Sequence, residues 1–579
     1  MNPRARIKHV RIRIAAFVLA ALAGVAPAFT QQAKPDGLAE IQQYIAGGWD
    51  SLTRSLTNCD TLRDKLGQAR VLYLPNGLPA PAAVHDLQKK CSAKVEHLPD
   101  KIEKLASLDL SHIKVHGLLY LEHPYVVPGG FFNEMYGWDS YFISRGLVRD
   151  GRVDLARGMV ENFFFEIDHY GAILNSNRTY HLTRSQPPFL TSMILAVYEA
   201  EKAAGRESKS WLEKAYRYAV RDHALWVEAP HLAGDTGLSR YYDFGEGPAP
   251  EVPDAEYQYI VRHLLRNPEM DRGYLAASDR AEDAALFTGP VFTVKLCSAE
   301  KAEQAQGRSR QPADAAKDGC ETIRTAGLTR DFYKGDRSVR ESGFDISFRF
   351  GPFSGSTHHF APVCLNSLLY KVETDLEHMA LLLGRASEAA NWRERARIRK
   401  ERMSRYFWDS AAGLFFDYDF KKQKRSSYIY ASAFYPLWAG LASPEQAAAL
   451  VENLPLFEEP GGIVMSRTET KSQWDYPYGW GPIQLIAAEG LRRHGYDEDA
   501  NRISVKFLAT VLGNFARDRT IREKYNVVTR SSETRVEVGY ADNVIGFGWT
   551  NGAFVALLDA LPAEWKARLE KAVMDAVAR

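Results

Sequence analysis

Residues 128–142 read PGGFFNEMYGWDSYF, and this stretch tells more about the chain than any other. A proline and two glycines interrupt the backbone, after which aromatic residues are interspersed with the carboxylates of Glu134 and Asp139. Flat rings can cover the C–H faces of a sugar, and carboxylates can accept hydrogen bonds from its hydroxyls. Two interpretations are open: an aromatic core segment that enters a helix, or one wall of a sugar site. The rest of the sequence has to decide between them.

The composition is that of an ordinary soluble globular protein. The chain has 579 residues, of which 45% are hydrophobic and 25% are charged, so it can bury a large core. Its 73 basic and 72 acidic side chains leave a formal net charge of +1. Because there is no surplus of Lys and Arg to neutralise phosphates, nucleic-acid binding has no electrostatic support. A small, neutral, polar ligand suits this balance better.

The first residues predict an export signal. Several arginines and a lysine within residues 4–13 precede an apolar run at 14–25, and residues 26–28 (APA) offer a small-residue cleavage site. The apolar run is short for a membrane span, although an uncleaved anchor is the alternative. We therefore expect residues 1–28 to be a signal peptide. The mature protein is expected to be periplasmic or secreted and to make no membrane contact.

The five cysteines fit an oxidising compartment without forming a dense disulfide scaffold. Cys59 with Cys91, and Cys297 with Cys320, are candidate local pairs that would each close a loop of moderate length. Cys364 is left over in an apolar helical run, where a buried free thiol is expected. No spacing of Cys and His residues resembles a zinc site, so we expect no metal.

Helical periodicity dominates from about residue 140 onward. Apolar residues recur at intervals of three and four, as in helices that bury one face, and strand-like alternation is scarce. The segments with this pattern are 141–148, 153–165, 189–203, 211–227, 359–383, 431–441, 446–454, 479–494, 502–512, 547–558 and 564–577. Residues 443–446 (SPEQ) mark one helix start, with an N-cap serine followed by proline and, at the third helical position, glutamine. Many helices joined by loops rich in Gly, Pro and aromatic residues predict an all-α fold of paired helices, and a toroid of such hairpins would gather its loops at one end.

Two regions stand outside this pattern. Residues 29–114 are mixed and include Pro-rich stretches, so we expect an N-terminal extension packed on a main body formed by residues 115–579. Residues from about 297 to 329 are polar and poor in aromatic side chains, which predicts a surface insertion. A lid over a nearby site is one interpretation of this insertion, and a functionally neutral loop is the favoured one.

Three further loop clusters hold side chains that suit a sugar. Residues 175–189 (NSNRTYHLTRSQPPF) carry amide and guanidinium groups that can bond vicinal hydroxyls, although loop and cap hydrogen bonds would also explain the asparagines. Residues 473–484 (QWDYPYGWGPIQ) are denser in aromatic rings than a plain core turn requires. Residues 522–527 place Glu523 between two cations, for which the alternative is a surface ion pair.

A fourth cluster, residues 340–351 (RESGFDISFRFG), contains the strongest candidate acid. Asp345 lies in a turn opened by a glycine and is flanked by phenylalanines. A carboxyl pressed against apolar rings resists ionisation because desolvation disfavours its charged form, so Asp345 is a candidate proton donor at neutral pH. A structural aspartate that caps a helix or pairs with Arg349 is the alternative. Asp345 and Glu523 together would supply the two carboxyls that glycoside hydrolysis requires.

These motifs, in this order, resemble the trehalase family of glycoside hydrolases. The two markers of that family read PGGRFxExYxWDxY and QWDxPxGWxP; the chain matches the first at 128–141 with one departure and the second fully at 473–482. It also matches the family's NRTY…RSQPP run, its SG(W)D turn, its EKYN segment and the GFGWTNG run at 546–552. The resemblance covers about residue 115 to the end.

The resemblance implies an (α/α)₆ toroid, built of six helical hairpins, that hydrolyses α,α-trehalose to two glucose molecules with inversion and without a metal or other cofactor. By motif, Asp345 corresponds to the general acid and Glu523 to the general base that positions the attacking water. The implied substrate-binding positions are Phe132, Tyr136, Trp138, Asp139, Asn175, Arg184, Gln186, Glu251, Gly343, Trp474 and Glu537. Glu537 matches least well because its spacing to residues 546–552 differs from the pattern. The expected partner is a small sugar, bound by a monomer.

The chain also departs from the family pattern. Phe131 stands where the family has an arginine after Gly-Gly, and Ala249 replaces an arginine before Glu251. Phe344 replaces a tryptophan, and Cys364 replaces a helix aspartate. A charged hydrogen bond to a sugar contributes about 1.5–3 kcal/mol, so an inverting glycosidase for another glucoside is one alternative, and a catalytically silent sugar-binding protein is a less favoured one. The candidate replacements for the missing cations are Arg178, Arg240, Arg340 and Arg349.

Overall fold

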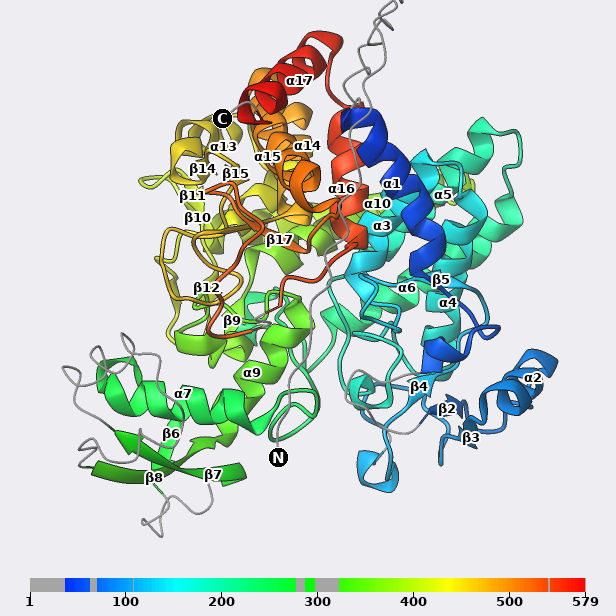
Figure 1. The fold of residues 1–579 in the computed structure, drawn as a ribbon, viewed down its shortest axis with the longest axis vertical. Coiled ribbons are helices and arrows are strands. Elements are labelled where there is room, and N and C mark those ends of the chain that lie inside the picture. The colour runs from blue at the N-terminus through cyan, green and yellow to red at the C-terminus, as the bar shows by residue number, and fades with distance from the viewer. Residues whose placement is uncertain are drawn as a thin grey trace, which may run out of the picture. The chain divides into compact units, whose positions relative to one another are not determined.

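The computed structural model describes residues 37–62, 70–107, 109–277, 287–296, 322–539 and 542–577. The predicted signal peptide at 1–28 and the predicted Cys297–Cys320 pair lie outside these ranges. Figure 1 shows that the described chain is mainly helical, with several small sheets between the helices. Among the described residues, no helix combines the length and the apolarity that a membrane crossing requires.

Each segment with helical periodicity contains a helix. These helices are α3 (Gly137–Arg149), α4 (Val153–His169), α5 (Leu190–Ala203), α6 (Lys209–Val227), α10 (Val363–Leu382), α12 (Tyr435–Trp438), α13 (Pro444–Glu452), α14 (Gly481–Arg493), α15 (Asp497–Asp518), α16 (Gly548–Asp559) and α17 (Ala563–Val577). The predicted start of α13 is confirmed: Ser443 Oγ accepts from the backbone N of Gln446 at 3.2 Å, and Gln446 Oε1 accepts from the backbone N of Ser443 at 2.9 Å.

Among the described residues, five helices have no counterpart among the predicted segments: α1 (Gly37–Leu52), α2 (Ala82–Cys91), α7 (Asp254–Arg266), α9 (Arg330–Ser342) and α11 (Ala386–Tyr406). Two of them carry few apolar side chains. The helix α11 is mostly charged and exposed, and it is anchored by few apolar side chains such as Trp392 and Met403. The helix α9 is almost entirely buried although most of its residues are polar, because its charged groups pair with one another and with neighbouring loops.

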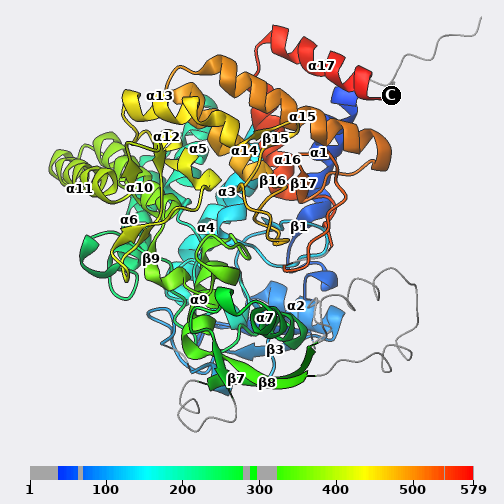
Figure 2. The same cartoon turned by 90° about the vertical axis from the view of Figure 1, so that its left-hand side faces the viewer.

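Six helices pack in succession. The helix α3 contacts α5, α5 contacts α10, α10 contacts α12, α12 contacts α14, α14 contacts α16, and α16 contacts α3 again. Further helices lie against this series: α4 against α3 and α5, α6 against α5 and α10, α11 against α10, and α15 against α14 and α16. Figure 2 shows α3, α14 and α16 close together, with α11, α13 and α17 farther out.

The contact between α3 and α16 is unusually close. A Cβ atom added to Gly552 on α16 would lie 1.9 Å from the backbone oxygen of Phe142 on α3. On α3 itself, a Cβ atom added to Gly146 would lie 2.5 Å from a ring carbon of Trp49 on α1. Gly552 therefore lets α16 approach the backbone of α3, at the point where the series of six helices closes. Gly146 lets α3 approach the side chain of Trp49 on α1.

The N-terminal region contacts the helices that follow it. The helix α1 lies against α15 and α16 (Figure 1), and β1 (Thr53–Arg54) pairs with β5 (Tyr125–Val126). The strand β2 (Val71–Leu74) lies between β3 (Lys94–His97) and β4 (Leu118–Leu119) in a parallel sheet. Cys59 and Cys91 form the first predicted disulfide, and Cys364 is a buried free thiol as expected.

A three-stranded antiparallel sheet beside α7 was not predicted (Figure 1). It consists of β6 (Leu275–Ala277), β8 (Thr322–Thr329) and β7 (Phe287–Leu296), with β8 in the middle. The residues of β8 fall within the predicted surface insertion at about 297–329. Two of them, Ala326 and Leu328, are instead buried in this sheet. Residues 297–321 lie outside the described ranges.

Short strand pairs shape the remaining loops. They are β9 (Phe360–Ala361), β12 (Tyr418–Asp419) and β13 (Lys424–Arg425) in one sheet, β10 (Trp408–Asp409) with β11 (Leu414–Phe415), β14 (Glu458–Glu459) with β15 (Gly462–Ile463), and β16 (Tyr478–Trp480) with β17 (Lys524–Asn526). The pairing of β16 with β17 brings two of the sequence motifs, 473–482 and 522–527, side by side.

The close α3–α16 contact can be tested by a pair of matched substitutions. Gly552→Ala should lower the free energy of unfolding by about 1–3 kcal/mol, because the added methyl overpacks the helix contact. Gly513→Ala, on α15, should leave stability unchanged or raise it by up to about 1 kcal/mol, because its Cβ would meet no atom within 4 Å and alanine favours helix. Urea denaturation measures both; equal effects would contradict the packing account.

Candidate active site

One pocket collects side chains from all the sequence clusters described above. About 630 Å³ of empty space, partly open to solvent, lies among its lining residues. Those residues are Pro128, Phe132, Tyr136, Trp138, Asp139, Asn175, His181, Arg184, Gln186, Glu251, Arg340, Gly343, Asp345, Gln473, Trp474, Trp480, Glu523, Phe547 and Trp549. Every predicted site residue except Glu537 is among them.

The lining residues lie on loops and at the starts of helices. The segment 128–139 leads into the first turn of α3, and the loop between α4 and α5 carries Asn175, Arg184 and Gln186. Glu251 precedes α7, Gly343 and Asp345 follow α9, Trp474 precedes β16, and Glu523 precedes β17. Loops that are far apart in the sequence therefore meet at one place.

Gly343 shows why one motif residue has to be glycine. It ends α9 in the left-handed conformation, with φ of 74°, which glycine adopts without strain. A Cβ atom here would also lie 2.7 Å from the indole ring of Trp138. The turn that carries Asp345 can therefore pack directly against the aromatic wall of the pocket.

Burial raises the pKa of two of the pocket carboxyls. Burial raises the pKa of Asp345 to about 7, against the opposing effect of Arg340 and Arg184. Burial also raises the pKa of Asp139 well above its usual range, and the nearby charges of Glu523 and Asp345 add to this. Asp345 can therefore carry a proton near neutral pH, as the sequence analysis anticipated from its apolar neighbours.

Arg340 is the cation beside Asp345. Its Nη1 lies 3.7 Å from Asp345 Oδ2, while Nη2 pairs with Asp336 at 2.9 Å and with Glu256 at 3.2 Å. Arg349 pairs with Asp417 at 2.6 Å instead, so the alternative in which Asp345 is a structural partner of Arg349 is wrong. The charge of Arg340 is shared among three carboxyls, which leaves Asp345 only weakly paired.

Glu523 is buried and paired with the residue that follows it. Its Oε2 lies 2.8 Å from Lys524 Nζ, and both side chains are almost fully inaccessible to solvent. The Lys524 ammonium lies 5.1 Å from the centre of the Trp480 ring, and the backbone oxygen of Glu523 accepts from Trp549 Nε1 at 3.2 Å. The interpretation of Glu523 as part of a surface ion pair is therefore wrong.

Arginines were the expected replacements for the missing family cations, and of the four candidates only Arg340 lines the pocket. The others are engaged elsewhere: Arg178 with Glu134 at 2.6 Å, Arg349 with Asp417, and Arg240 with the backbone oxygens of Pro230 and His358. Arg184 also lines the pocket, where it pairs with Glu251. This contact lowers the pKa of Glu251 despite its burial.

Aromatic rings form the apolar wall. The indoles of Trp474 and Trp480 stack with 3.8 Å between ring centres, and Trp138 and Trp549 meet Trp474 at 5.9 and 6.1 Å. Phe132 is buried, whereas the ring of Phe131 beside it is 59% exposed. The stretch 128–142 therefore supplies both core packing and pocket wall, so its two interpretations hold together.

Glu537 is not brought to the pocket. Its carboxylate is exposed, accepts from Tyr259 Oη at 2.8 Å and pairs with Lys471 Nζ at 2.7 Å. It is also the predicted residue that matches the family spacing least well. Conversely, Pro128, His181, Gln473, Trp480, Phe547 and Trp549 line the pocket without having been predicted. All but His181 lie within the three motifs 128–141, 473–482 and 546–552, and His181 lies within the cluster at 175–189.

Comparisons with known proteins agree on one family. A family model described as Trehalase matches residues 27–284 and 296–562. A cytosolic neutral trehalase of Saccharomyces cerevisiae is 35% identical over 573 residues, which cover 88% of this chain and 69% of that protein. A cytosolic neutral trehalase of Emericella nidulans is 34% identical, covering 84% of this chain and 63% of that protein. A solved structure of a neutral trehalase from Saccharomyces cerevisiae superposes with a TM-score of 0.71 at 30% identity, covering 93% of this chain and 96% of that one.

The names of these relatives contradict the predicted location. Relatives matching most of this chain are called cytosolic. The prediction of a signal peptide and of a periplasmic or secreted protein is therefore wrong.

The raised pKa of Asp345 has a consequence for stability. Between pH 3.8 and about 7 the folded protein keeps the Asp345 proton, whereas the unfolded chain releases it. The free energy of unfolding therefore decreases as pH rises through this range. Asp345→Asn should therefore stabilise the protein at pH 8, by at most about 4 kcal/mol, and by less at pH 5. Urea denaturation at both values, with the exposed Asp86→Asn as control, measures this. A gain that does not depend on pH would contradict the burial account.

Proposed function

The chain belongs to the trehalase family, and on that premise we propose that it is a glycoside hydrolase that cleaves α,α-trehalose into two glucose molecules. The observation that carries the proposal is the pocket in which Asp345 and Glu523, from separate loops, line the same space as aromatic rings and polar groups. Two carboxyls that line one pocket suit acid/base hydrolysis of a glycosidic bond. The relatives named above are themselves trehalases.

The family also suggests how the helices are organised. We infer that α3, α5, α10, α12, α14 and α16 form the inner ring of an (α/α)₆ toroid, with further helices packed on its outside. The succession of contacts that returns from α16 to α3 supports this arrangement. Residues 115–579 would form this catalytic domain, residues 29–114 an extension attached through α1, and residues between β7 and β8 an insertion. Loops gathered at one end of such a ring account for a pocket lined from residues 128 to 549.

Asp345 is assigned as the general acid. A carboxyl with a pKa of about 7 is protonated in a large fraction of molecules at neutral pH and is acidic enough to give its proton away. The proton passes to the glycosidic oxygen as the bond from that oxygen to the anomeric carbon breaks. Arg340, 3.7 Å away, then faces the negative charge left on Asp345.

Glu523 is assigned as the general base. It takes a proton from a water molecule that attacks the anomeric carbon on the face opposite the leaving oxygen, which inverts the configuration at that carbon. Lys524 bonds one carboxylate oxygen, so the ion pair orients the carboxylate and leaves its other oxygen for the water. The backbone bond from Trp549 fixes the position of the residue.

The remaining lining residues are assigned to the sugar hydroxyls and faces. Asp139, Arg184 and Glu251 offer charged or protonated hydrogen-bonding groups, and Asn175 and Gln186 offer amides. Phe132, Tyr136, Trp138 and Trp474 offer rings against which C–H faces can pack. At the two positions where the family pattern has arginines, Phe131 and Ala249 offer no charge, so Arg340 and Arg184 are the cations left to the substrate.

The assignment of acid and base predicts a sharp loss of turnover. Asp345→Asn and Glu523→Gln should each lower kcat for trehalose by about 10²–10⁴-fold. Glu537→Gln should leave kcat unchanged, because this carboxylate lies outside the pocket. Release of glucose from trehalose, followed with a coupled assay, measures all three. Near-normal turnover in either pocket variant would refute its assignment, and cleavage of another α-glucoside but not of trehalose would replace the proposed substrate.

The pKa of Asp345 predicts the alkaline limb of the pH profile. Since the acid must be protonated, kcat/KM should fall as pH rises through about 7, approaching tenfold per pH unit above it. Arg340 lowers the pKa of Asp345, so Arg340→Gln should move this limb to higher pH whatever it does to the maximal rate. A limb that stays in place in Arg340→Gln would show that another group controls it.

A further inference from the structure

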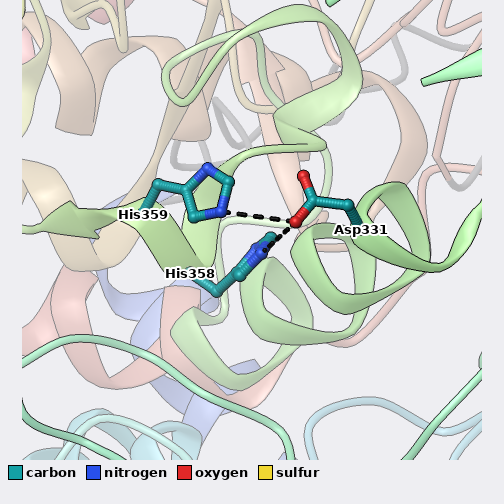
Figure 3. A group of neighbouring side chains, drawn as sticks. All are labelled: Asp331, His358 and His359. Atoms are coloured by element: carbon teal, nitrogen blue, oxygen red, sulfur yellow. Dashed lines mark hydrogen bonds and ion pairs between the residues drawn. The ribbon is translucent and has the colours of Figure 1, made fainter. Parts of the chain in front are cut away.

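Three side chains outside the pocket have the donor set of a metal site. Asp331 lies in the first turn of α9, and His358 and His359 lie in the 3₁₀ helix η9 (Thr357–His359). Figure 3 shows both imidazole rings directed at the same carboxylate oxygen of Asp331. Asp331 Oδ1 lies 3.0 Å from His358 Nε2 and 3.4 Å from His359 Nε2. None of the three lines the sugar pocket.

We propose that Asp331, His358 and His359 bind one zinc ion. In a tetrahedral site with bonds of about 2.0–2.1 Å, two ligand atoms lie about 3.3 Å apart. Both distances from Asp331 Oδ1 are close to that value, and the three ligand atoms all lie within 4.8 Å of one another. Three ligand atoms this close together can occupy one face of a tetrahedral site.

The chemistry of the donors selects the class of metal. Two imidazole nitrogens and one carboxylate oxygen suit zinc and neighbouring transition metals, whereas calcium and magnesium prefer oxygen ligands alone. Imidazole binds metals through a neutral ring nitrogen.

The site is held in place on one side and open on the other. Arg240 Nη1 donates to the backbone oxygen of His358 at 2.7 Å. The backbone N of Phe420 donates to the backbone oxygen of His359 at 3.1 Å. The Asp331 side chain is 54% exposed and that of His359 is 21% exposed. An ion can therefore enter from solvent, and a water molecule can take the fourth position.

The position of the site indicates a structural role. Asp331 and His358 are 27 residues apart, so their pairing comes from the fold and no motif spacing reveals it. A bound ion would join the start of α9 to the segment that leads into α10. Because α9 ends at the turn that carries Asp345, the ion would stabilise the helix that positions this residue without contacting the substrate.

Calorimetric titration of zinc chloride into chelator-treated, full-length protein tests the proposal. We expect one ion per chain and a rise in the midpoint of thermal unfolding, because a ligand that binds the folded state stabilises it. His359→Asn and Asp331→Asn should each weaken zinc binding at least tenfold and abolish the rise. The matched control is His112→Asn, which removes a surface histidine 3.8 Å from Asp109 and should change neither quantity.

Two results would overturn the proposal. One is the absence of saturable zinc binding to the unaltered chain. The other is unchanged zinc affinity in both His359→Asn and Asp331→Asn, which would place the ion elsewhere. Comparing the zinc-induced shift within each variant, instead of the unfolding midpoints themselves, separates loss of the site from any general destabilisation.

Discussion

The chemistry of the pocket depends on keeping carboxyl groups out of water beside only a few buried cations. An isolated buried carboxylate is costly, so it either finds a partner or holds its proton. Both outcomes occur here: Glu251 is paired with Arg184, whereas burial raises the pKa of Asp345 and Asp139. Different environments for neighbouring carboxyls are what allows one to give a proton and another to receive one.

The scaffold can be understood as the means of holding these groups in place. The helix α9 is buried although most of its residues are charged or polar, because Arg337 and Arg340 meet the carboxylates of Asp243 and Asp336. It ends at Gly343, which packs against Trp138, and Asp345 follows two residues later. Elsewhere, α3 and α16 approach closely through a small residue.

Sequence alone predicted the helices whose apolar residues repeat along one face, such as α5 and α16. It missed α9 and α11, since buried ion pairs stabilise the first and a few apolar anchors hold the second, and periodicity detects neither. The motifs located most of the pocket because they bring the required residue types together in short stretches. Contacts between distant segments, as between Glu523 and its aromatic surroundings or between Asp331 and His358, were not visible in any local pattern.

The central claim is that one pocket carboxyl protonates the leaving oxygen while another activates water on the opposite face of the sugar. Proton NMR of the glucose first released from α,α-trehalose, recorded before the anomers equilibrate, tests it most directly. Direct attack by water on one anomeric carbon predicts equal amounts of α- and β-glucose. Release of α-glucose alone would show that configuration is retained, and would contradict the assignment of Glu523 as a base acting through water.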